Sequence, residues 1–211
     1  EKRILSSLII IPVALFFLIQ GSVSFIFFLS ILFLATSYEW IKMIKKHDFL
    51  RILGIIFLFF SFYSAYQFRN IVRFEYFLLI VLICIFTDIG GYIFGKLFKG
   101  PKLTSISPNK TYSGAIGGYM FSILTVTLFF EFSLLSLNKN DILINTYVMI
   151  ILISSVSQLG DIVISYFKRL SNIKDTGKII PGHGGLLDRA DGMVFAFPFS
   201  YVMLSINFNF F

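Results

Sequence analysis

Residues 4–38 form one continuous run without Asp, Glu, Lys or Arg. The run is too long for a single membrane-spanning helix, which needs about 20 apolar residues. Gln20, Gly21 and Ser22 supply a turn near its middle. The pattern therefore predicts two spans, at 4–19 and 22–38. No small-residue cleavage site follows the first span, so we interpret it as an uncleaved span and not as a signal peptide.

The whole chain is unusually apolar. Of its 211 residues, 57% are hydrophobic and only 14% are charged, whereas a soluble domain has about 45–50% and about 25%. One water-soluble core could not bury this much apolar surface. The composition excludes a soluble globular enzyme and a disordered chain. A disulfide scaffold is excluded because Cys84 is the single cysteine.

We expect an all-α polytopic integral membrane protein with about seven transmembrane helices of some 20 residues each. A sixth span is expected to begin near residue 142 and to become polar by Asp161. The other spans after the first two are expected at 52–68, 76–98, 114–137 and 193–211. We further expect an N-terminal region of helices, 1–75, and a functional region, 76–211, in one structural unit.

The distribution of positive charge predicts the orientation. With the N-terminus inside, only Arg69, Arg73 and Lys139 of the 18 Lys and Arg residues fall outside, which leaves 15 in cytoplasmic segments. The positive-inside rule favours this arrangement. The polar segments 99–113 and 170–192 then both face the cytoplasm. The Lys and Arg residues behind the net charge of +7 follow the orientation of the spans in the membrane, so we expect no nucleic-acid partner.

A polar stripe follows one face of the expected sixth helix. Its members are spaced by four, three, four and three residues and therefore share a face: Ser154, Gln158, Asp161, Ser165 and Lys168. Such a stripe on an apolar helix must face protein or a water-filled cavity. The Asp161 carboxylate needs a cation there. The residues alone leave two alternatives equally open, a Mg²⁺ ion or an ion pair with a nearby Lys or Arg.

The segment 170–192 combines glycines, carboxylates and basic residues. Gly182, Gly184 and Gly185 surround His183, and an apolar helix follows. Glycines and a helix N-terminus favour a bound anion such as phosphate. Asp188 and Asp191 share a helix face and would repel that anion unless a divalent ion bridged them to it. An ordinary basic loop with a glycine turn is the alternative.

Two further polar features lie outside this segment. Asp88 is a carboxylate inside an expected span, which indicates either a functional site or an ion pair needed for folding. Lys110 lies in a polar loop, where it could contact a phosphate. Glycines at a spacing of four, in 91–95 and 114–118, indicate close packing of two helices.

The most specific motif spans 165–191. The segments 165–169 (SYFKR), 174–175 (KD) and 181–191 (PGHGGLLDRAD) resemble the signature of the phosphatidate cytidylyltransferase (CDP-diacylglycerol synthase) family. The resemblance extends over about residues 85–200. It implies Mg²⁺-dependent transfer of CMP from CTP to phosphatidic acid, with CDP-diacylglycerol and pyrophosphate as products.

The resemblance also implies roles for individual residues. Asp161 and Asp188 would hold the metal. Ser165, Lys168 and Arg169 would line the phosphate site. The remaining candidates for catalysis or substrate binding are Lys174, Asp175, His183, Gly184, Gly185, Arg189 and Asp191, with Asp88 and Lys110 as secondary candidates.

Other functions remain as alternatives. A related membrane lipid kinase or an isoprenoid-lipid cytidylyltransferase would use similar chemistry, and an ion or phosphate transporter would place carboxylates across the membrane depth. The partners expected for the leading hypothesis are CTP, phosphatidic acid and the lipid bilayer. The sequence does not determine the oligomeric state, and a homodimer is one state open to it. Abundant Phe, Ile, Asn and Lys are typical of an AT-rich genome, which suggests a bacterial inner membrane.

Overall fold

The structure is a computed structural model that describes residues 12–45, 47–108, 110–131, 144–179 and 184–206. The described residues contain no strand beyond one isolated bridge between Lys102 and Thr111, and helices account for most of them. The expected all-α fold is confirmed. Residues 12–20 are helical, and six helices follow: α2 Ser22–Met43, α3 Asp48–Ile71, α4 Phe74–Phe98, α5 Tyr112–Glu131, α6 Ile144–Leu170 and α7 Leu187–Ser205.

Five of the described helices, α2 to α6, are long and apolar enough to cross a membrane, and α7 is not among them. The chain is therefore an integral membrane protein. The full count of about seven spans stays a prediction, because residues 4–11 of the first expected span lie outside the described residues. The expected turn between the first two spans is confirmed at Gly21, whose φ of 63° favours glycine.

The observed helices extend beyond several of the expected spans. α2 continues through Met43, where the sequence predicted an end at residue 38, and α3 begins at Asp48 and not at residue 52. α7 begins at Leu187 and ends at Ser205, whereas the last span was expected at 193–211. The physical reason is that a helix continues past the apolar stretch while its polar residues find partners.

α4 and α5 pack closely through their glycines. Gly90 lies against Gly117, and a Cβ atom added at Gly95 would lie 3.7 Å from the Cα atom of Gly114. A Cβ atom at Gly90 or Gly117 would overlap the opposite helix. The expected role of the glycine spacing in helix packing is therefore confirmed. This packing holds α4 and α5 together, and the two helices form one wall of the site.

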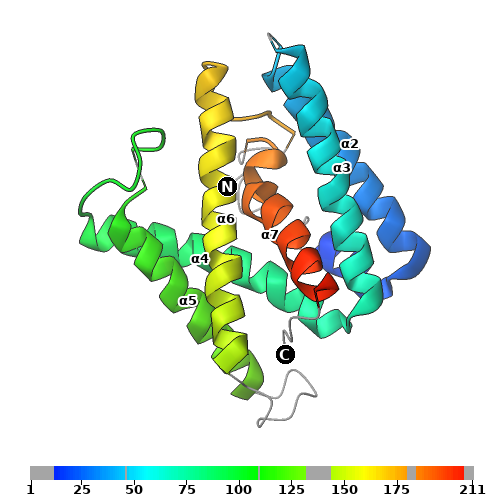
Figure 1. Cartoon of the computed structure of the whole chain (residues 1–211), viewed down its shortest axis with the longest axis vertical. Helices are drawn as coiled ribbons and strands as arrows, with labels where there is room; N and C mark the ends of the chain where they lie inside the picture. Colours follow the sequence, from blue (N-terminus) through cyan, green and yellow to red (C-terminus); the bar gives the residue numbers. More distant parts are fainter. Residues whose placement is uncertain (1–11, 46, 109, 132–143, 180–183, 207–211) are drawn as a thin grey trace.

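Two hydrophobic clusters hold the remaining helices together. The smaller cluster joins four helices: Trp40 and Met43 of α2 with Ile44 directly after it, Leu58 of α3, Ile164 of α6, and Leu187 and Val194 of α7. The larger cluster also combines residues from both sides of the expected boundary at residue 75, such as Phe68 and Phe77. Figure 1 shows α7 between α6 and the α2–α3 pair.

Candidate active site

A cavity of about 420 Å³ lies between α4, α5, α6 and α7. Its wall is built from α4, the loop before α5, the beginning of α5, the C-terminal half of α6, the segment after α6 and the first turns of α7. Segments that the sequence assigned to the same side of the membrane therefore meet in one place. The charged residues that line the cavity are Asp88, Lys110, Asp161, Lys168, Asp175, Asp188, Arg189 and Asp191.

The cavity carries more acidic than basic residues. Five aspartates face three cationic side chains, a formal surplus of two negative charges. Asp191 lies outside the five candidate spans and is 6% exposed. Its burial, together with the nearby charges of Asp161 and Asp88, raises the pKa of Asp191 well above its usual range. A bound cation would relieve this repulsion.

Asp161 forms an ion pair with Lys110, with 2.5 Å between Oδ2 and Nζ. The hydroxyl of Ser165, one turn further along α6, lies 3.3 Å from the other carboxylate oxygen and donates to it. This ion pair is one of the two alternatives that the sequence left open for Asp161. Gln158, Asp161 and Lys168 of the polar stripe line the cavity. Ser154 and Ser165 contact protein, so the stripe faces protein and a cavity, as its spacing predicted.

The loop that carries Lys110 is fixed by its own backbone hydrogen bonds. The amide of Leu103 donates to the carbonyl of Lys110 at 2.8 Å, and the amide of Lys110 donates to the carbonyl of Ser107 at 3.0 Å. Thr111 then accepts from the amide of Gly114 at 3.1 Å and caps the start of α5. These contacts direct Lys110 across the cavity toward α6.

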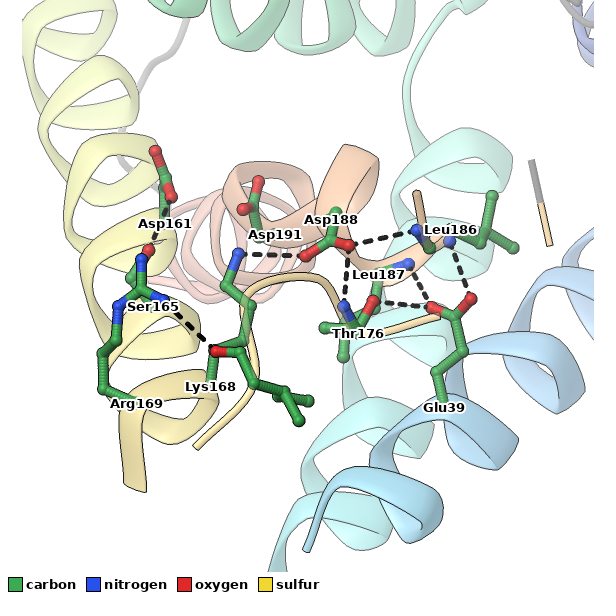
Figure 2. Close-up of polar contacts among 12 residues, drawn as sticks. Glu39, Asp161, Ser165, Lys168, Arg169, Thr176, Leu186, Leu187, Asp188 and Asp191 are labelled. Carbon is green, nitrogen blue, oxygen red and sulfur yellow. Dashed lines mark hydrogen bonds and ion pairs between the residues drawn. The ribbon is translucent and has the colours of Figure 1, made fainter. Parts of the chain in front are cut away.

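Asp188 is held on both of its oxygens. Oδ1 lies 2.9 Å from Nζ of Lys168, and the two side chains are only 7% and 11% exposed. Oδ2 accepts from the amides of Thr176 at 2.8 Å and Gly185 at 3.0 Å. Figure 2 shows Lys168 reaching from α6 toward this carboxylate at the start of α7.

The N-terminus of α7 is already occupied by carboxylates of the protein. Gly185 donates to Asp188, and the amides of Leu186 and Leu187 donate to Glu39 at 3.0 and 2.8 Å. The sequence predicted a phosphate at this glycine turn. In the structure, the anions at these amides are side chains, so the space left for a ligand is the cavity beside Asp188.

Not every candidate residue reaches the cavity. Arg169 does not line it and instead donates from Nη1 to the carbonyl of Ile173 at 3.2 Å. Lys174 is exposed and also does not line it. Gly184 and Gly185 lie beside the Asp188 carboxylate and do not line the cavity. His183 lies outside the described residues. Eight charged candidates nevertheless converge on one cavity from segments far apart in the sequence.

Sequence reasoning missed Glu39 and Thr176. Glu39 of α2 is 1% exposed and contacts the functional loop, which is the segment 171–186 between α6 and α7. Thr176 of this loop is 4% exposed. One signal is present in the sequence: Glu39 is the first charged residue after the uncharged run 4–38.

Five candidate spans and a cavity lined by charged side chains define a membrane-embedded class of protein whose site combines carboxylates with Lys and Arg side chains. The sequence model of the cytidylyltransferase family matches residues 47–207. The chain therefore belongs to the cytidylyltransferase family.

Similar proteins include bacterial ones named phosphatidate cytidylyltransferase. The one from Staphylococcus epidermidis is 44% identical over 131 residues, which cover 62% of this chain and 49% of the relative. The one from Staphylococcus aureus is 39% identical over 137 residues, with the same coverage of both chains. The chain thus spans about half the length of the curated relatives it matches.

Proposed function

We propose that the protein transfers CMP from CTP to phosphatidic acid and releases pyrophosphate. The observation that carries this proposal is the convergence of Asp161, Lys168 and Asp188 from two separate helices on one cavity. The names of the relatives supply the substrate class. We further propose that the cavity faces the cytoplasm of a bacterial inner membrane, because this orientation places 15 of the 18 Lys and Arg residues inside.

The donor set of the cavity fits a hard divalent cation such as Mg²⁺. Carboxylate oxygens of Asp161 and Asp188 are suitable ligands, and the surplus of acidic residues would be neutralised. Among the described residues, no group of three or more His, Cys, Asp or Glu is arranged to hold a metal. Mg²⁺ commonly uses one or two carboxylates and completes its shell with substrate phosphates and water. When bound, the ion would supply charge neutralisation at the phosphates.

The residues of the chain account for the rest of the chemistry. Phosphatidic acid and CTP are both anions, so bringing them together requires positive charge and fixed orientation. Lys110, Lys168 and Arg189 line the cavity and can neutralise phosphate oxygens. The attacking oxygen belongs to a phosphate that is already ionised at neutral pH, so no general base is required. The cavity needs to align the two phosphates and to stabilise the leaving pyrophosphate.

The location of the site fits a lipid substrate. The polar face of α6 is part of a helix that is apolar enough to span a membrane, and Asp161 and Lys168 lie in its C-terminal half. A lipid could therefore keep its acyl chains in the bilayer while its phosphate enters the cavity. CTP, which is soluble, would enter the cavity from the water and not from the bilayer.

The test is pyrophosphate release by the purified protein in detergent or nanodiscs, supplied with CTP, Mg²⁺ and one candidate lipid at a time. We expect release with phosphatidic acid. A lipid kinase would instead release a nucleoside diphosphate, and an isoprenoid-lipid enzyme would respond only to a polyprenyl phosphate. Either of these results would replace the proposed substrate.

A further inference from the structure

Glu39 is a buried carboxylate that binds the functional loop from outside the matched family region, which begins at residue 47. It is 1% exposed near the end of α2. Its Oε2 atom accepts from the hydroxyl of Thr176 at 2.9 Å and from the amide of Leu187 at 2.8 Å, and its Oε1 atom accepts from the amide of Leu186 at 3.0 Å. Figure 2 shows these bonds beside the contacts of Asp188.

Thr176 connects Glu39 to Asp188. Its hydroxyl donates to Glu39, and its backbone amide donates to Oδ2 of Asp188 at 2.8 Å. The amide of Gly185 occupies the same Asp188 oxygen, at 3.0 Å. The second oxygen of Asp188 is therefore the one left to face Lys168 and the cavity. Glu39 thus fixes both chain segments that orient Asp188.

The surrounding residues leave Glu39 little freedom to move. A Cβ atom at Gly177 or Gly185 would overlap the Glu39 carboxylate or its partner Thr176. The neighbouring Trp40 is 5% exposed, donates toward the carbonyls of Leu50 and Arg51 in α3, and packs edge-on against a ring of α6. α2 is therefore anchored next to the residue that reaches into the loop.

We propose that Glu39 is a positioning residue that sets the orientation of the Asp188 carboxylate through Thr176 and the first amides of α7. Its effect on loop geometry is independent of the reaction, and its effect on turnover rests on the proposed function. The charge of Glu39 is required because all three partners are donors and a carboxylate only accepts. In Glu39→Gln, the new NH₂ group would face at least one of these donors.

The first measurement is amide hydrogen exchange by mass spectrometry on the full chain in nanodiscs. In Glu39→Gln, we expect exchange in peptides that contain residues 176 and 185–187 to become about tenfold faster, because a bond to a charged acceptor is lost. Peptides from α4 and α5 should exchange as in the wild type. The matched control is Ser37→Ala, which removes a buried hydroxyl of α2 that has no hydrogen-bond partner among the described residues. Loop exchange in Glu39→Gln equal to that in Ser37→Ala would overturn the proposal.

The second measurement is steady-state kinetics of the same variants. We expect kcat to fall about 10- to 100-fold in Glu39→Gln, as for other residues that orient a ligand-binding side chain, with the KM for the lipid little changed. Thr176→Val should have a similar effect, and Thr176→Ser should retain more activity. The kcat of the double variant Glu39→Gln with Thr176→Val should be no lower than that of the less active single variant. Additive losses in the double variant would contradict a shared path through Thr176.

The two proposals can fail separately. A wild type that does not turn over CTP, together with faster loop exchange in Glu39→Gln, would refute the proposed reaction and support the positioning of Asp188. An active wild type together with unchanged loop exchange in Glu39→Gln would support the proposed reaction and refute the positioning of Asp188. If Glu39→Gln does not fold, Thr176→Val provides the same comparison from the loop side.

Discussion

Lys110 and Asp161 meet at 2.5 Å across the cavity, although one lies in the loop before α5 and the other in the C-terminal half of α6. Their side chains are 22% and 30% exposed, so the pair is reached by water. The contact joins the α4–α5 wall to the α6–α7 wall of the cavity. A lysine at this point can neutralise either a carboxylate or a phosphate.

Replacing Lys110 with Met should impair substrate binding more than folding. We expect the KM for CTP to rise about tenfold because a charge-assisted contact to phosphate is lost. The free energy of unfolding should change by less than about 1 kcal/mol, because partly exposed pairs contribute little. The control is Lys102→Met in the same loop, because Lys102 is exposed and does not line the cavity. Equal KM values in the two variants would contradict a role for Lys110 at the phosphates.

Replacing Lys168 with Met should destabilise the protein. Asp188 would remain buried without its lysine, at a cost of about 3 kcal/mol. Lys168→Arg keeps the positive charge and should lose less. Thermal unfolding followed by intrinsic fluorescence checks this prediction, and a Lys168→Met variant as stable as Lys168→Arg would show that the two amides alone satisfy Asp188.

Gly185 and Gly91 should respond differently to alanine. At Gly185, the added Cβ would overlap Thr176 and lie 2.6 Å from Oε2 of Glu39, so we expect a loss of about 1–3 kcal/mol from overpacking. At Gly91, the nearest atom is the carbonyl oxygen of Gly114 at 3.7 Å, and stability should stay within about 1 kcal/mol of the wild type. Thermal unfolding midpoints compare them directly. A Gly185→Ala variant with the wild-type midpoint would mean that the loop adapts freely.

Removing divalent cations should stop the reaction without unfolding the protein. We expect EDTA to abolish pyrophosphate release and excess Mg²⁺ to restore it. Because a ligand stabilises the state that binds it, Mg²⁺ with CTP should also raise the thermal midpoint of the wild type and should do so less in Asp161→Asn. Full activity in EDTA would exclude the proposed divalent ion.

Much of the site could be predicted from local spacing. A helix brings Asp161, Ser165 and Lys168 to one face; Asp161 and Lys168 line the cavity, and Ser165 donates to Asp161. The same rule explains why Arg169 is absent from the cavity, since adjacent residues point about 100° apart on a helix. Local periodicity therefore identified the functional face of α6. Arg169 was included only because it follows Lys168 in the motif 165–169.

The partners of these residues depend on tertiary packing and could not be predicted. Glu39 and Leu187 are 148 positions apart in the sequence, and the contact exists because α2, α3 and α7 pack around Trp40. The pairing of Asp161 with Lys110 depends in the same way on the packing of α5 against α6, where Gln158 donates to the carbonyl of Ala115. Hydropathy predicted which segments are helices, but it contains no information on which helix ends meet.

The most direct measurement follows the phosphorus atoms of CTP in the wild type and in folded Asp161→Asn and Asp188→Asn variants. With phosphatidic acid and Mg²⁺, we expect label from the α-phosphate of CTP to enter the lipid fraction, label from the γ-phosphate to leave as pyrophosphate, and both variants to lose this transfer. Transfer of the γ-label to lipid, or undiminished α-transfer in both variants, would contradict the account.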